Sequence, residues 1–493
     1  MVFKQSKLFS FLWSKSNRLR GELDVDRFKD YVLTLLFVKY ASDRFADVPD
    51  APIVVPRGAG FRELAALKGH PQIGRRINDE ILAPLAAANG LSDLPDFNDS
   101  AQLGVGPAMV ERLTKLIEIF ENEALDFSTA PLDADADPLG DAYEYLMRYC
   151  AAARPERGDR GERSGRRDRC YTPAEVSRVM AQVLGLDESV AAAATVYDPV
   201  CGFGSPLIGL PHPSRRRLSL FGQAGDSATG GLARMHIRSR DRMLPSLALG
   251  DTLAAPQFRD GDKLKTFDFV LANPPLDRSD WRVGLDPLVD PFKRFQPFGA
   301  PPERRSSYAY LLHVVQSLNP SGRGVCVLPQ RVLSRGSRGD AEAEIRWALV
   351  RKGLISGLIG LPPNLFFGTG RAMSLVVVDR HEAYARKGIF MIDAGLGFVK
   401  DGYKNRLRER DVQRIVDAFQ SRLELPRYSR MVSIREIAAA DYNLNVAHYI
   451  DRRATEVDSS ESARVRTAWP TSHAAAPLDC PSPSPPESVL GER

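Results

Sequence analysis

The sequence predicts an α/β fold in which a doubly wound domain follows an all-helical N-terminal domain. The first observation is a helical spacing of apolar residues from Leu8 to about Phe127. The second is a series of seven short apolar runs that alternate with helical segments between Thr195 and about Arg380. Strands that alternate with helices are typical of a sheet covered by helices on both faces, which binds its ligands at the carboxyl ends of the strands.

The helical domain is expected over residues 1–150. Its apolar side chains recur at intervals of three and four residues, as Phe28, Val32 and Leu35 illustrate, and a second stretch of this kind begins at Val110. Such spacing places the apolar residues on one face of each helix. We therefore expect helices that bury these faces against one another.

The remaining boundaries follow from changes in composition. Residues 151–170 are expected to form a linker, because ARPERGDRGERSGRRDR holds seven arginines among Gly, Pro and acidic residues and has no aliphatic anchor. The doubly wound domain is expected over residues 171–425, and a C-terminal extension that contacts partners over residues 426–465. The tail 466–493 ends in CPSPSPPESVLGER, whose Pro and Ser content predicts disorder.

The predicted strands of the second domain are short apolar runs, several of which end in polar or glycine-rich turns. Residues that bind a ligand are expected in those turns. In chain order the runs are TVYDPV, LSLFGQ, LALGD, FDFVLANPP, GVCVLPQ, ISGLIGLP and SLVVVD.

Composition excludes several classes of protein. The chain has no run of about 18 apolar residues that could cross a membrane, and its start, MVFKQSKLFSFLWSK, does not resemble a secretion signal. Its five cysteines contain no CxxC pair, so we expect neither a disulfide framework nor a metal site, and they fit the cytoplasm. With 67 Lys and Arg against 62 Asp and Glu, the net charge of +5 permits a nucleic-acid partner without indicating one.

Two motifs place glycine or acidic residues after predicted strands. In VYDPVCGFGSPLIGL, Asp198 is followed by Gly202 and Gly204, which let a ligand approach the backbone closely. This motif is not the GxGxxG of dinucleotide-binding proteins, because Leu207 stands at the position of the third glycine. In LALGDTL, Asp251 ends a strand, where its carboxylate could accept a hydrogen bond from an adenine amino group.

The third motif is the turn from Asn273 to Leu276, which ends the run FDFVLANPPL. Two prolines make this turn rigid and poor in backbone donors, so that the side chain of Asn273 and the carbonyl of Pro274 can both accept bonds from one planar amino group. These bonds raise the electron density on the nitrogen and direct it at an electrophilic methyl group held nearby. The turn therefore indicates methyl transfer to a planar amine.

In this order the three motifs resemble those of S-adenosylmethionine-dependent methyltransferases that act on amino groups of DNA. From about Leu8 to Asp451 the chain is similar to the modification subunit of type I restriction–modification systems, a family of N-6 adenine-specific DNA methyltransferases. The segments that carry this resemblance are LWSKSNRLRGELDVDRFKDYVLTLLFVKYASDRF, LGDAYEYLMRY, YTPAEVSRVM, LSLFGQ, LALGDTL, IGLPPNLFFGTG and DYNLNVAHYID.

The resemblance implies a Rossmann-like S-adenosylmethionine-dependent methyltransferase domain that follows the helical domain along the chain. It implies transfer of a methyl group to the exocyclic amine of adenine in DNA, and the target base must be flipped out of its stack. It also implies a hetero-oligomer, in which a separate specificity subunit selects the DNA sequence and a restriction subunit can join.

The resemblance also assigns functional residues. Asn273, Pro274 and Pro275 match the catalytic turn, and Leu276 stands where the family usually has an aromatic residue that stacks on the flipped base. The cofactor residues that it implies are Tyr171, Thr172 and Pro173 beside the methionine end, Asp198, Gly202, Gly204 and Ser205 in the cofactor loop, and Asp251 at the adenine.

Three further positions depart from the family pattern. Ala224 replaces a Glu that holds the ribose, and Asp226 could replace that Glu only if the loop is rearranged; Phe203 replaces a small residue and Cys170 a Phe. Two alternatives to an active methyltransferase subunit therefore stay open. One is a catalytically impaired or non-catalytic structural subunit, and the other is a protein-glutamine methyltransferase, which also uses an Asn-Pro-Pro turn.

Overall fold

A computed structural model describes residues 12–19, 25–128 and 171–451, apart from residues 13, 188, 189, 192, 212–216, 241–244, 277, 367, 368, 402 and 403. The predicted linker and the predicted disordered tail lie outside the described residues, as do Cys150, Cys170 and Cys480. Within the described part, no helix has the length and apolar character needed to span a bilayer.

The N-terminal domain is helical, as predicted. The longest of its described helices, α2, buries Val32, Leu35 and Leu36, and α7 buries Leu113 and Leu116 in the same core. The described elements are α2 (Val25–Phe45), α3 (Phe61–Ala66), α4 (Ile73–Arg76), the π-helix η1 (Ile77–Leu82), α5 (Ala83–Asn89), α6 (Ser100–Leu103), α7 (Pro107–Phe120) and the 3-10 turn η2 (Glu123–Leu125).

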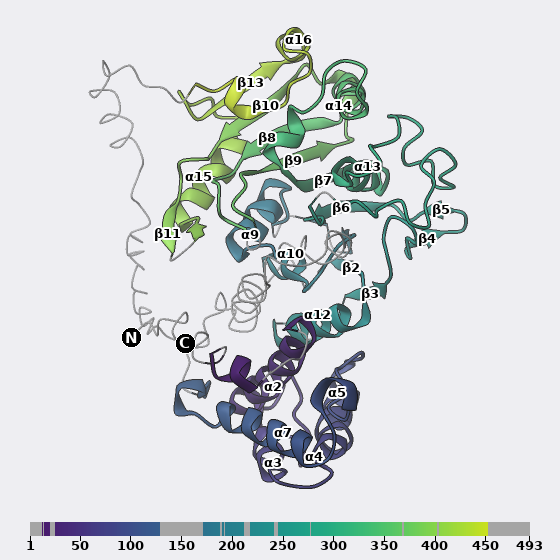
Figure 1. The fold of residues 1–493 in the computed structure, drawn as a ribbon. Coiled ribbons are helices and arrows are strands. Elements are labelled where there is room, and N and C mark those ends of the chain that lie inside the picture. The colour runs from purple at the N-terminus through teal and green to yellow at the C-terminus, as the bar shows by residue number, and fades with distance from the viewer. Residues whose placement is uncertain are drawn as a thin grey trace, which may run out of the picture. The chain divides into compact units, whose positions relative to one another are not determined.

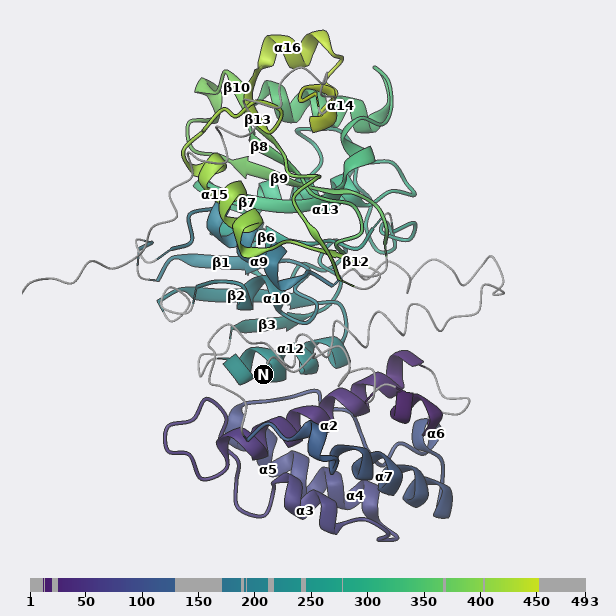
Figure 2. The ribbon, with the colours of Figure 1, turned by 90° about the vertical axis from the view of Figure 1, so that its left-hand side faces the viewer.

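A single sheet organises the rest of the chain, with nine strands among the described residues (Figures 1 and 2). Its order is β13-β10-β8-β9-β7-β6-β1-β2-β3. The strands are β1 (Thr195–Asp198), β2 (Ser219–Ala224), β3 (Ser246–Leu249), β6 (Phe267–Ala272), β7 (Leu318–Pro329), β8 (Ile355–Gly360), β9 (Met373–Asp379), β10 (Gly388–Asp393) and β13 (Ser429–Ser433).

All seven predicted runs are strands of this sheet. The sheet is mixed rather than wholly parallel, because β9 runs antiparallel to both β7 and β8, and β13 runs antiparallel to β10. The edge strand β13 lies in the range that the sequence assigned to a C-terminal extension, and 3-10 turn η5 (Val446–His448) follows it after α16 (Ile434–Ala439). Two hairpins stand apart from the sheet: β4 (Arg259–Asp260) with β5 (Lys263–Leu264), and β11 (Val399–Asp401) with β12 (Lys404–Arg406).

Helices cover both faces of the sheet, and side chains alternate between two cores. Along β7, Val325 and Val327 belong to one core, whereas Cys326 and Leu328 belong to the other, as the two-residue period of a strand requires. Figure 1 shows α9 and α15 on the first face and α13 and α14 on the second. The bounds are α9 (Ala174–Val183), α10 (Ser205–Ile208), α12 (Ser227–Arg240), α13 (Ser307–Gln316), α14 (Ala341–Arg351) and α15 (Glu409–Gln420), with 3-10 turns η3 (Gln330–Leu333) and η4 (Ala383–Ala385).

The strands β3, β2, β1, β6 and β7 are parallel to one another, so their carboxyl ends share one edge of the sheet. The turns after β1, β3 and β6 meet at this edge and contain most of the predicted site residues, whereas Tyr171–Pro173 lie directly before α9. The connection from β6 to α13, residues 273–306, forms no helix or strand in its described part. Buried aromatic side chains instead hold it to the domain, among them Trp281, Phe295 and Phe298.

Candidate functional site

A cavity of about 310 Å³ lies at the carboxyl ends of β1, β2, β3 and β6. Such a volume is at the lower end of the range for small-molecule sites. Seven of the twelve residues that the sequence assigns to a site line the cavity: Tyr171, Thr172, Gly202, Ser205, Asp251, Asn273 and Pro275. The other five, which do not line it, are Pro173, Asp198, Gly204, Pro274 and Leu276.

The glycine loop after β1 forms one wall of the cavity. Gly202 and Gly204 have positive φ angles of 51° and 83°, which L side chains rarely adopt. A Cβ atom at Gly204 would lie 2.8 Å from the Cδ1 atom of Ile237 in α12. The loop is therefore packed tightly from behind, so that its other side can face a ligand.

Phe203, between these glycines, lines the cavity, and its ring also packs on α12. The ring stacks on His236 of α12, with 4.2 Å between ring centroids and an interplanar angle of 24°. The carbonyl oxygen of Phe203 lies 2.9 Å from Nδ1 of the same histidine. The residue is only 5% exposed, so this large side chain is accommodated by packing against the helix.

Polar groups of the loop remain available to a ligand. The Oγ atom of Ser205 is buried and has no hydrogen-bond partner among the residues that the structure describes. A buried hydroxyl without a partner is costly, and Ser205 lines the cavity. Its hydroxyl is thus a candidate donor or acceptor for a polar ligand.

Asp198 ends β1 directly behind the loop and is fully buried. One carboxylate oxygen, Oδ1, accepts the N–H of Val200 at 3.0 Å, whereas Oδ2 has no partner in the described part of the chain. Burial raises the pKa of Asp198 to about 8, against a smaller lowering by the bond from Val200. The carboxyl is therefore largely protonated at neutral pH.

This raised pKa predicts a pH-dependent effect of Asp198→Asn on stability. An aspartate in the unfolded chain ionises near about pH 4, so between about pH 4 and 8 the folded chain holds the extra proton and the parent loses stability as pH rises. The asparagine variant lacks this loss. Thermal midpoints measured without ligand should therefore shift in favour of Asp198→Asn between pH 5 and pH 8. Parallel pH profiles for the two proteins would contradict the prediction.

The turn after β2 places a carboxylate at position 226 rather than 224. Ala224 is fully buried, and the next residues to line the cavity are Gly225 and Asp226. Asp226 Oδ1 accepts the N–H of Thr229 at 2.9 Å, and Oδ2 accepts the Thr229 hydroxyl at 3.0 Å. These bonds fix Asp226 at the cavity, at the position that the sequence had offered as a conditional replacement for the acid missing at 224.

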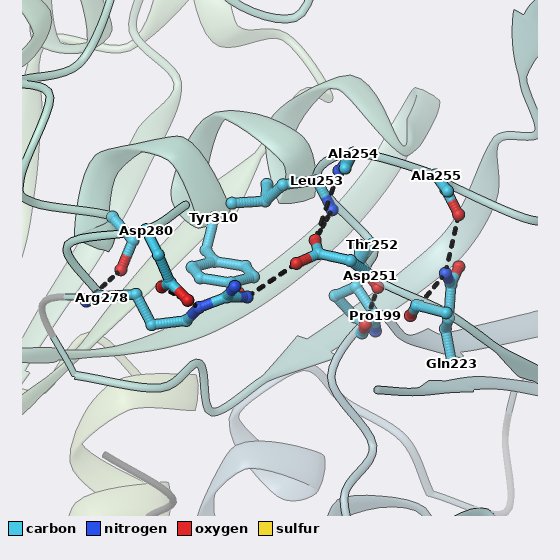
Figure 3. A network of polar contacts seen from close by, with 12 residues as sticks. Pro199, Gln223, Asp251, Thr252, Leu253, Ala254, Ala255, Arg278, Asp280 and Tyr310 are labelled. Atoms are coloured by element: carbon cyan, nitrogen blue, oxygen red, sulfur yellow. Dashed lines mark hydrogen bonds and ion pairs between the residues drawn. The ribbon is translucent and has the colours of Figure 1, made fainter. Parts of the chain in front are cut away.

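The turn after β3 holds Asp251 from two sides (Figure 3). Asp251 Oδ1 accepts the backbone N–H of Leu253 at 2.8 Å, and Oδ2 accepts a bond of 2.8 Å from Nη1 of Arg278. Behind the turn, Nε2 of Gln223 donates to the carbonyl oxygens of Gly250 and Ala255, each at 3.0 Å. The sequence analysis singled out Asp251 but did not identify Arg278, which binds its carboxylate, or Gln223, which holds the backbone of its turn.

The turn after β6 brings Asn273 to the same cavity. Its Nδ2 atom donates to Oγ1 of Thr172 at 2.9 Å, across 101 residues of sequence. The predicted catalytic turn therefore contacts the segment predicted to lie beside the cofactor. Pro275 also lines the cavity, whereas Leu276 is only 6% exposed and packs in the core on the α9 side of the sheet.

A family model described as N-6 DNA Methylase matches residues 134–458, which is more than half of the chain. The chain belongs to the N-6 DNA methylase family. A second model, described as HsdM N-terminal domain, matches residues 8–120 and covers the helical domain.

Individual proteins that are similar to this chain are also methylase subunits. The chain is 28% identical to the type I restriction enzyme MjaVII methylase subunit of Methanocaldococcus jannaschii, over 74% of this chain and 62% of that protein. It is 26% identical to the MpnII methylase subunit of Mycoplasma pneumoniae, over 90% and 89%. A crystal structure of a type I methyltransferase subunit from Streptococcus thermophilus matches with a TM-score of 0.66 and 26% identity, over 91% of this chain and all of the other.

These findings confirm the predicted family, its α/β methyltransferase fold, the class of enzyme and the cofactor, S-adenosylmethionine. The residues of this N-6 DNA methylase also fit the cofactor. The cavity offers glycine backbone and a buried Ser205 hydroxyl on one side, and the carboxylates of Asp226 and Asp251 on the other. Carboxylates suit the hydroxyl and amino donors of a nucleoside.

Proposed function

We propose that this chain is the methyltransferase subunit of a type I restriction–modification complex, and that it transfers a methyl group from S-adenosylmethionine to the exocyclic amino group of adenine in DNA. The observation that carries the proposal is the hydrogen bond between Asn273 and Thr172. It joins the Asn-Pro-Pro turn to the cavity that also contains Asp226 and Asp251.

Each wall of the cavity has a role in this proposal. The turn with Asp251 would accept the cofactor's adenine amine, and Asp226 would accept its ribose hydroxyls in place of an acid at 224. The segment Tyr171–Pro173 and the glycine loop would surround the methionine end. When bound, S-adenosylmethionine supplies an electrophilic methyl group attached to a sulfonium centre.

The catalytic turn would act on the target base. The side-chain oxygen of Asn273 and the carbonyl oxygen of Pro274 would each accept a hydrogen bond from one N–H group of the flipped adenine amine. These two hydrogen bonds would raise the electron density on the amine nitrogen. As the nitrogen gained the methyl group, the methyl–sulfur bond would break and its electrons would stay on sulfur, which leaves as a neutral thioether. The nitrogen would become cationic, and the same oxygens would stabilise that charge until one proton left to solvent. Because Leu276 packs in the core, the stacking surface for the base would come from other residues.

Partners follow from the relatives, which are named as methylase subunits of multi-subunit enzymes. We propose that a specificity subunit selects the DNA site and that a restriction subunit joins the same hetero-oligomer. A DNA substrate also agrees with the cytoplasm predicted from the cysteines. The non-catalytic alternative loses support, because the cavity retains carboxylates after both β2 and β3.

The test is transfer of a radioactive methyl group from S-adenosylmethionine to unmethylated DNA by the full chain co-expressed with its specificity subunit. We expect label in N6-methyladenine, and no label when the DNA has been methylated beforehand at the same sites. The chain alone should bind DNA weakly and without sequence preference, because its net charge is only +5. An assembled complex that binds cofactor and DNA but transfers no methyl group would refute the proposal.

A further inference from the structure

Arg278 connects the catalytic turn with the turn at Asp251. It follows Asn273 by five residues and lines the same cavity. Its Nη1 atom donates to Oδ2 of Asp251 at 2.8 Å and to the hydroxyl of Tyr310 at 3.1 Å, and its Nε atom donates to Oδ1 of Asp280 at 3.0 Å (Figure 3). The side chain is 21% exposed, so the guanidinium is fixed in one place at the border of the cavity.

The bonds around Asp251 leave a defined place for one more donor. A carboxylate offers about four acceptor sites. The backbone N–H groups of Leu253 and Ala254 both bind Oδ1, and Arg278 binds Oδ2. An amine that enters the cavity would therefore bind at Oδ2, beside the guanidinium, and the direction of that bond depends on Arg278.

A second arginine of the same connection supports this arrangement. Arg294, which is fully buried, directs Nη1 toward the carbonyl oxygen of Thr252 at 3.4 Å. The hydroxyl of Thr252 in turn donates to the carbonyl of Pro199 in the glycine loop. The segment that begins with the catalytic turn therefore reaches Asp251 and Thr252 through two separate side chains.

We infer that Arg278 is a positioning residue for the cofactor's adenine: it orients the Asp251 carboxylate to accept the 6-amino group, and it ties this subsite to the segment that carries Asn273. The inference rests on the proposed function, because it takes S-adenosylmethionine as the ligand. Arg278 acts through Asp251 and need not touch the cofactor. Its loss should therefore affect recognition of one chemical group more than binding of the whole molecule.

The experiment compares two ligands in calorimetric titrations of the full chain. The probes are S-adenosylhomocysteine and its analogue with hydrogen in place of the 6-amino group. We expect the parent to prefer the first by about tenfold, the value of a hydrogen bond to a charged group. Arg278→Gln should bind S-adenosylhomocysteine about tenfold more weakly and lose most of that preference. Arg278→Lys keeps a charge near Asp251 but lacks the rigid planar fork that binds Asp251, Tyr310 and Asp280 at once. Its preference should lie between those of the parent and Arg278→Gln.

The matched control is Arg304→Gln, which removes an exposed arginine from the same connection. It should keep both the affinity and the preference of the parent. Asp280→Asn, which leaves the pair of Arg278 and Asp251 intact, should keep most of the preference. If Arg278→Gln does not fold, Arg278→Lys serves as the second variant. Equal preference in the parent and in either Arg278 variant would overturn the inference while leaving the proposed function in place. If the parent binds neither ligand, the proposed function itself fails.

Discussion

Asn273→Ala is expected to lower the rate of methyl transfer by about a hundredfold to a thousandfold, the effect of removing one group that stabilises charge in a transition state. The hydrogen bond from Nδ2 of Asn273 to Thr172 fixes the plane of the amide and so the position of its oxygen. Alanine removes that oxygen from beside the target amine. Because the cofactor is held mainly by other walls of the cavity, its affinity should change only a few-fold.

Single-turnover methylation by the assembled complex and equilibrium binding of S-adenosylmethionine measure the two effects separately. Thr172→Val is the matched variant, because it keeps Asn273 but removes the hydroxyl that orients it. It should lower the rate by about tenfold, the value of one hydrogen bond. If Asn273→Ala methylates DNA as fast as the parent, the Asn-Pro-Pro turn is not the catalytic group.

Asp290→Ala should destabilise the fold by about 3–5 kcal/mol, the usual cost of breaking a buried ion pair. The side chains of Asp290 and Arg294 are each 1% exposed and are joined by two hydrogen bonds, Nη2 to Oδ1 at 2.8 Å and Nε to Oδ2 at 2.9 Å. Nη1 of the guanidinium also lies 3.4 Å from the carbonyl oxygen of Thr252 and from Nδ1 of His313, and burial lowers the pKa of His313 well below the usual value, so the imidazole stays neutral. The variant would therefore leave a buried charge without a counterion.

Denaturant unfolding, followed together with proteolysis within residues 273–306, would test this expectation. Asp79→Ala is the control, since Asp79 pairs with Arg75 on the protein surface and both side chains are more than 60% exposed. Such exposed ion pairs contribute little to the free energy of unfolding. Replacing the buried pair by Leu at 290 and Met at 294 should recover much of the stability. A variant Asp290→Ala as stable as the control would show that the pair does not hold this segment.

The sequence predicted the regular elements well because their periodicity comes directly from burial. The seven runs were apolar enough to indicate strands buried on both faces, and all are strands of the sheet. Strands β10 and β13 follow the last of the predicted strands, which ends near Arg380, and were not predicted. β10 has only the short apolar run Ile389–Ile392, and β13 is an edge strand in which buried and exposed residues mix. Neither pattern is distinctive without its partner strand.

The residues of the candidate site also fall into a group that the sequence predicted and a group that it did not. Asn273, Asp251 and the glycine loop were predicted because each motif is continuous in sequence. Arg278 and Tyr310 were missed, since their roles depend on contacts across 27 and 32 residues. Charged residues such as Asp290 and Arg294 also suggest a solvated loop when they are taken alone. Only the folded connection shows that these two side chains are buried together.

The close packing behind Ala224 limits how this chain can evolve. A methyl group at Gly230 of α12 would lie 3.8 Å from the Cβ atom of Ala224 and 2.6 Å from Leu249, so the helix lies close against the end of β2. A glutamate introduced at position 224 would enter a fully buried position, and the cost of that buried charge would destabilise the mutant and oppose any gain in cofactor affinity. Accommodating a glutamate at 224 therefore requires a change that moves α12 outward. Under the proposed function, the acid at the cofactor's ribose is therefore Asp226, which lines the cavity, rather than a residue at 224.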